Sequence, residues 1–103
     1  VNNIFNKTNI FDCVQIWKDL PGFKLIPHTD NPIIDVGLQI YLSENPGIKD
    51  ATTFYYQDKV IKFKHKQNSG YLMDNSKKIL HDFTAEIPEN DVRFSLHAIW
   101  IKS

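Results

Sequence analysis

Hydrophobic and polar residues alternate along most of the chain, and the clearest alternation covers residues 35–43. One face of this segment carries four apolar side chains, those of Val36, Leu38, Ile40 and Leu42. Successive side chains of a strand point to opposite faces, so a period of two predicts a β-strand here. Residues 92–102 alternate in the same way and are predicted to form the last strand.

Shorter segments rich in β-branched and aromatic residues are also predicted to be strands: residues 12–18, 23–28, 52–56, 59–64, 71–73 and 79–85. A helix is the alternative for residues 12–18, because short apolar runs are ambiguous by periodicity. Residues 1–10 are Asn-rich and are expected to be irregular or briefly helical. About eight short strands separated by turns, with little or no helix, predict an all-β domain, specifically a double-stranded β-helix or jelly roll.

The apolar stripe of residues 36–42 faces away from the side that carries Tyr41. If the Tyr41 side lines the interior of the domain, the stripe lies outside and needs a cover. We therefore expect either a homodimer contact through this stripe or a helical layer that is missing from the chain.

Length and charge narrow the class of protein. A chain of 103 residues predicts one domain, residues 1–103, with an N-terminus that we expect to be truncated because it begins at Val1. Twelve basic and twelve acidic residues balance, so no nucleic-acid partner is expected. No apolar run is long enough to span a bilayer, so no membrane association is expected. The single Cys13 excludes an internal disulfide, which favours a cytoplasmic setting.

The segment His28-Thr29-Asp30 carries the first candidate chemistry. In an extended chain the imidazole of His28 and the carboxylate of Asp30 lie on one face. They would supply two ligands of the 2-His-1-carboxylate set that suits non-haem Fe(II). A lone motif of this kind is more often a solvated strand end. The candidates for the missing second histidine are His65, His81 and His97, of which His65 is most simply a solvated residue.

Arg93 and Ser95 stand two residues apart at the start of the last predicted strand, so both face the same side. A buried arginine is costly unless it meets a carboxylate. We expect no acidic partner for Arg93 on the interior side beyond Asp30, so a bound small-molecule carboxylate would satisfy it. The alternative is that Arg93 faces outward, which leaves the side of Phe94 as the core side.

The order of these parts resembles the Fe(II)- and 2-oxoglutarate-dependent dioxygenases, most closely the prolyl-hydroxylase-like branch. The resemblance covers residues 14–100. It is carried by His28-Thr29-Asp30, Tyr41-Leu42, His81 and Arg93-Phe94-Ser95-Leu96, in that order.

The resemblance implies that His28, Asp30 and His81 ligate Fe(II). It also implies that Arg93, Ser95 and the Tyr41 hydroxyl bind the distal carboxylate of 2-oxoglutarate, with ascorbate as a further candidate cofactor. The activity it implies is that of an oxygenase, a hydroxylase, which couples decarboxylation to succinate with oxidation of a small-molecule or peptidyl substrate. Gln39 is expected to line the cavity around the metal, and His97 is expected to line it more deeply. Trp17 is a further candidate for this lining, but a core position is favoured for it.

Two alternatives from other classes stay open. The chain is alternatively a non-catalytic jelly-roll interaction module related to the oxygenases, with the 36–42 stripe as its working surface. A cupin-type metalloenzyme is less favoured, because its strand motif supplies two histidines where this chain has His28 and Asp30.

Overall fold

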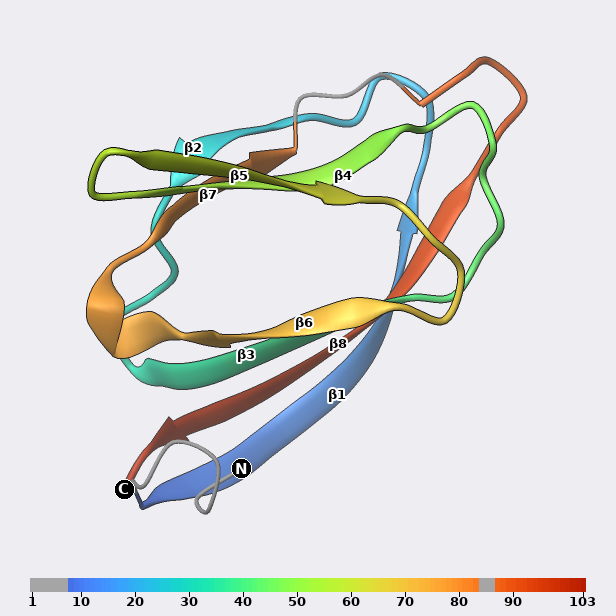
Figure 1. Cartoon of the computed structure of the whole chain (residues 1–103). Coiled ribbons are helices and arrows are strands. Elements are labelled where there is room, and N and C mark those ends of the chain that lie inside the picture. Colours follow the sequence, from blue (N-terminus) through green and yellow to red (C-terminus); the bar gives the residue numbers. More distant parts are fainter. Residues whose placement is uncertain (1–7, 84–86) are drawn as a thin grey trace.

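The computed structural model describes residues 8–83 and 87–103, and this part of the chain is all-β (Figure 1). Its strands are β1 (Asn9–Asp19), β2 (Leu25–His28), β3 (Ile34–Tyr41), β4 (Asp50–Tyr56), β5 (Lys59–Lys64), β6 (Gly70–Asp74), β7 (Leu80–Phe83) and β8 (Arg93–Lys102). The one helical element among the described residues is the short 3-10 helix η1 (Asn75–Lys77). No helix in the described ranges has the length and apolar character needed to cross a membrane.

The strands form two antiparallel sheets of four, which lie face to face in Figure 1. One sheet has the order β1-β8-β3-β6 and the other has the order β2-β7-β4-β5. We call them the β3 sheet and the β4 sheet. Apart from the β4–β5 hairpin, strands that follow one another in the chain, such as β7 and β8, therefore lie in different sheets. This arrangement brings residues from distant parts of the chain to the space between the sheets.

The helix considered for residues 12–18 is wrong, because these residues form the middle of β1. β1 pairs with β8 from Asn9 to Asp19, with one register shift between Phe11 and Cys13. Pairing with β8 decides between the two structures that the short apolar run permits. Residues 1–10 were expected to be irregular or briefly helical. Residues 1–7 lie outside the described residues, and Asn9 and Ile10 belong to β1.

The two faces of the β3 sheet divide as the alternation predicts. Tyr41 and Gln39 are buried on the inner face. On the outer face, the strand registers place apolar side chains side by side across the sheet, in the row Val14, Ala98, Leu38 and Leu72. Val14 and Leu72 are exposed, whereas Ala98 is buried. The homodimer or covering layer predicted for the 36–42 stripe, of which Val36 is fully buried, remains a prediction.

Candidate metal centre

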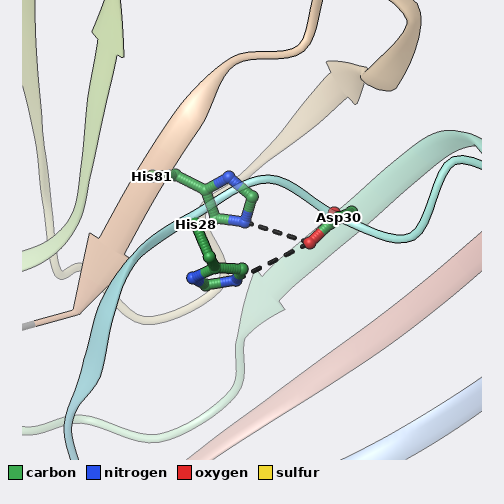
Figure 2. Close-up of side chains that lie close together, drawn as sticks. All are labelled: His28, Asp30 and His81. Atoms are coloured by element: carbon green, nitrogen blue, oxygen red, sulfur yellow. Dashed lines mark ion pairs between the residues drawn. The ribbon is translucent and has the colours of Figure 1, made fainter.

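His28 and His81 lie directly opposite each other on the neighbouring strands β2 and β7. Their rings are 4.4 Å apart between centroids. Asp30 follows β2 and turns back toward both rings (Figure 2). Its Oδ1 lies 3.2 Å from Nε2 of His81 and 3.7 Å from Nε2 of His28. The three side chains therefore converge on one point.

Backbone carbonyls set the orientation of both imidazoles. Nδ1 of His28 donates to the carbonyl of Ile26 at 2.8 Å, and Nδ1 of His81 donates to that of Ile79 at 3.1 Å. A neutral imidazole that carries its proton on Nδ1 has its lone pair on Nε2. Nε2 of each ring then faces the Asp30 carboxylate. Metal-ligating histidines are held in the same way, by a hydrogen bond from the nitrogen that does not bind the ion.

Hydrogen bonds from a residue that follows β6, in the β3 sheet, hold the turn after Asp30 in place. The buried side-chain amide of Asn75, in η1, donates to the carbonyls of Asn31 at 3.1 Å and Ile34 at 2.8 Å. These two bonds tie the turn between β2 and β3 to the end of β6. The carboxylate of Asp30 thus projects from a backbone that is anchored on both sides.

The electrostatics of the cluster favour a charged carboxylate. Burial opposes ionisation of Asp30, but the hydrogen bond and charge of His81, with the charge of His28, outweigh it and lower its pKa. Burial alone would lower the pKa of His81, but its hydrogen bonds to Asp30 and to the Ile79 carbonyl reverse this effect and raise it. The Asp30 carboxylate is therefore ionised and bonded to Nε2 of His81, and a metal ion would take the place of the proton between them.

The three side chains fit a divalent metal. Their ligand atoms all lie within 4.8 Å of one another, and no other group of this kind occurs in residues 8–83 and 87–103. Ligands at right angles around an ion with bonds of about 2.1 Å lie about 3.0 Å apart. The Asp30 oxygen is already close to this distance from both nitrogens, at 3.2 and 3.7 Å. Two imidazoles and one carboxylate on one side leave the other side of an ion open to solvent or substrate. The structure thus brings together all three predicted ligands.

The predicted solvent position of His65 is wrong. His65 follows β5 and donates from Nε2 to the carbonyl of Ser43 at 3.1 Å. Its ring lies 5.0 Å from that of Tyr41, and its Nδ1 is buried without a hydrogen-bond partner. The chain turns toward the β3 sheet immediately after β5, which removes His65 from the exposed face of that strand.

A cavity of about 360 Å³ lies between the sheets, beside the three ligands. Gln39 and His97 line it, as predicted. Trp17 lines it too, and the core position favoured for this residue is wrong, because 42% of its surface is exposed. Along its wall a chain of hydrogen bonds links Tyr71 to Gln39 at 2.6 Å, Gln39 to Ser95 at 3.3 Å and Ser95 to His97 at 3.1 Å. This chain fixes the polar side chains that face the candidate metal position across the cavity.

Arg93 is buried, with 3% of its surface exposed, and lines the cavity, so the outward alternative is wrong. The prediction that it lacks an acidic partner other than Asp30 is also wrong. Nε and Nη2 of Arg93 donate to Oδ2 of Asp19 at 3.0 and 2.8 Å. The two residues are direct partners in the β1–β8 register, so their side chains share the inner face. The sequence prediction ended this strand at residue 18 and so left Asp19 out.

Tyr41 and Ser95 are fully buried, and neither is among the described residues that line the cavity. The Tyr41 hydroxyl is bonded to Oγ1 of Thr52 at 2.8 Å, and its ring centroid lies 5.7 Å from Cζ of Arg93. Ser95 is engaged by Gln39 and His97. Of the three residues that the resemblance assigns to the cosubstrate, the structure brings Arg93 alone to the cavity wall.

No family model and no curated protein matches the chain. The resemblance to the dioxygenases therefore remains a prediction from the residues.

Asp19 and Tyr71 are two of the polar cavity residues that the sequence prediction missed. Gln15, Trp17 and Asp19 alternate on one face of β1, and continuing that alternation by one more step would have found Asp19. Tyr71 lay in a segment of only three predicted residues, which gave no pattern to assign its face.

Proposed function

We propose that this protein is an Fe(II)-dependent oxygenase, a hydroxylase, that uses a 2-oxo acid as cosubstrate. 2-Oxoglutarate is the 2-oxo acid that the resemblance implies. The observation that carries the proposal is the convergence of Nε2 of His28, Nε2 of His81 and the Asp30 carboxylate beside a cavity. This ligand set, with open positions on one side, is that of non-haem Fe(II) oxygenases.

We also propose that the sandwich is a jelly roll. The sheet orders β1-β8-β3-β6 and β2-β7-β4-β5 support this assignment, because each sheet combines strands from both halves of the chain. In such a fold the metal ligands sit on the inner face of one sheet and the other sheet covers them.

Each part of the site has a task in this proposal. Iron, when bound, supplies the activation of O₂ and the oxidation of a C–H bond. His28, Asp30 and His81 hold the ion on one side, and the backbone bonds to the two rings keep Nε2 free for it. The apolar part of the cavity wall keeps bulk water from the reacting groups. Arg93 fits an anionic cosubstrate in part, because Nη1 is buried without a partner while Nε and Nη2 are taken by Asp19.

The test is anaerobic Fe(II) binding, followed by addition of O₂ and 2-oxo acid, with the decarboxylated acid and CO₂ measured. We expect one Fe(II) per chain and slow decarboxylation even without the substrate. Both should be lost in His28→Ala, Asp30→Ala and His81→Ala. His65→Ala, which removes a histidine outside the cavity, is the matched control and should retain both. Iron binding that is unchanged in His81→Ala would refute the proposal.

A non-catalytic jelly-roll module is the second candidate, favoured by the exposed apolar side chains on the outer face of the β3 sheet. It predicts that Fe(II) binds no better to the native chain than to His81→Ala. The cytoplasmic setting, ascorbate and the small-molecule or peptidyl substrate remain predictions.

A further inference from the structure

Asp19 and Arg93 form a buried ion pair in the wall of the same cavity that holds the candidate metal ligands. Both side chains are 3% exposed. One oxygen of Asp19 accepts from both Nε and Nη2 of Arg93, and the guanidinium carbon lies 4.0 Å from the ring centroid of Phe83. Nη1 is the guanidinium nitrogen that has no hydrogen-bond partner. An internal carboxylate thus already occupies the edge of Arg93 that a ligand carboxylate would engage in bidentate fashion.

The charges that face the cavity can be counted. Asp19 and Asp30 each contribute a negative charge and Arg93 contributes a positive one. Asp82 also borders the cavity. It follows His81 on β7, so its side chain leaves the strand on the other face, where it accepts from the hydroxyl of Tyr55 at 2.7 Å. His28 and His81 are neutral as metal ligands. Burial lowers the pKa of His97, the third histidine of the cavity wall, which favours its neutral form. The walls therefore hold one net negative charge, which a divalent ion converts into one net positive charge.

We propose that this cavity binds a monoanionic 2-oxo acid with an apolar tail in preference to dianionic 2-oxoglutarate, and that Asp19 sets this preference. The inference rests on the proposed function, since it concerns the cosubstrate of the same metal site. A monoanion brings the cavity to neutrality, whereas a dianion leaves one uncompensated negative charge in a buried space, which is costly.

The shape and lining of the cavity agree with an apolar tail. Its exposed lining is mostly apolar, and the side chains beyond the metal ligands include Leu25, Ile34, Met73 and Ile99. A volume of about 360 Å³ accommodates a short-chain acid. A tail without charge needs no partner from Arg93, so the Asp19–Arg93 pair stays intact when the ligand binds.

The experiment compares 2-oxoglutarate with 2-oxopentanoate, which has the same carbon chain length and lacks the distal carboxylate. Binding to the Fe(II)-loaded chain is measured anaerobically by calorimetry, with the fluorescence of Trp17 in the cavity wall as a second readout. In the native chain we expect 2-oxopentanoate to bind about tenfold more tightly or better. In Asp19→Asn, which keeps a hydrogen-bond acceptor for Arg93, 2-oxoglutarate should gain about tenfold while 2-oxopentanoate changes little.

Asp12→Asn is the matched control, because it removes an exposed carboxylate from the same strand and should leave the ratio of affinities unchanged. The inference is overturned if 2-oxoglutarate binds the native chain as tightly as 2-oxopentanoate, or if neither acid binds. This comparison decides the matter even if Asp19→Asn does not fold. The proposed function fails separately, if Fe(II) does not bind or binds equally well to His81→Ala.

Discussion

Metal binding should raise the stability of the whole fold, because its ligands come from two strands and a turn. The ligand atoms already lie within 4.8 Å of one another, and hydrogen bonds hold both imidazoles with Nε2 free. Little ordering is therefore needed when the ion binds. At a free metal concentration of about 100 times Kd, linkage gives about 2.7 kcal/mol of stabilisation. For a domain of this size, each kcal/mol raises Tm by roughly 4–8 °C, so a total shift of about 10–20 °C is expected.

His81→Ala is the perturbation that tests this reasoning. His81 has the least exposed side chain of the three, at 10%, and the shortest contact to Asp30. Without it, His28 and Asp30 remain as two ligands from one short segment, and we expect less than about a quarter of the shift in Tm. The assay is anaerobic thermal unfolding with and without Fe(II), each variant being compared with its own metal-free form. His65→Ala should keep the full shift.

A shift in His81→Ala equal to that of the native chain would refute the reasoning, because the metal would then bind elsewhere. A native chain that shows no shift at saturating Fe(II) would refute it as well.

Three further predictions concern the surroundings of the site. Arg93→Met leaves Asp19 buried without a counter-charge and should lower the free energy of unfolding by about 3–5 kcal/mol in urea denaturation, whereas the double variant with Asp19→Leu should recover much of the loss. Gly70→Ala should lower the urea midpoint markedly, since its Cβ would lie 2.0 Å from the carbonyl oxygen of Gln39; an unchanged midpoint would contradict the close β3–β6 approach. Burial lowers the pKa of His65 from 6.5, so the unfolded chain takes up a proton at a higher pH than the folded chain does. The free energy of unfolding should therefore fall as pH drops below 6.5, by at most about 1.4 kcal/mol per pH unit. In His65→Gln this free energy should depend less steeply on pH.

The strands were predictable because burial on one face imposes a period of two on the sequence. β5 (Lys59–Lys64) has the predicted bounds, and the other strands end within a few residues of theirs. The helix alternative for residues 12–18 could not be excluded locally, because the decision depends on pairing with β8 across more than seventy residues of chain.

The candidate ligands were predictable in part. His28 and Asp30 lie two residues apart, so their common face follows from the extended backbone alone. The choice of His81 over His65 and His97 came from the resemblance, since the register of β2 against β7 is a tertiary property. The neutralisation of Arg93 by Asp19 was missed for the same reason, because a strand end one residue further along creates the pair.

The position of His28 on β2 has a consequence for the stability of the sheet edge if the proposed site holds a metal ion. β2 is an edge strand of four residues. It pairs with β7 at two positions, one of which is the His28–His81 pair. Sheet edges present unpaired backbone groups that template association with other chains. An ion bound by both β2 and β7 would hold the edge strand β2 against its neighbour. Removal of the ion should therefore let β2 detach more easily and promote aggregation. If the proposed function holds, chelation would remove both the activity and the stability of this edge, and the lifetime of the chain would depend on the supply of metal.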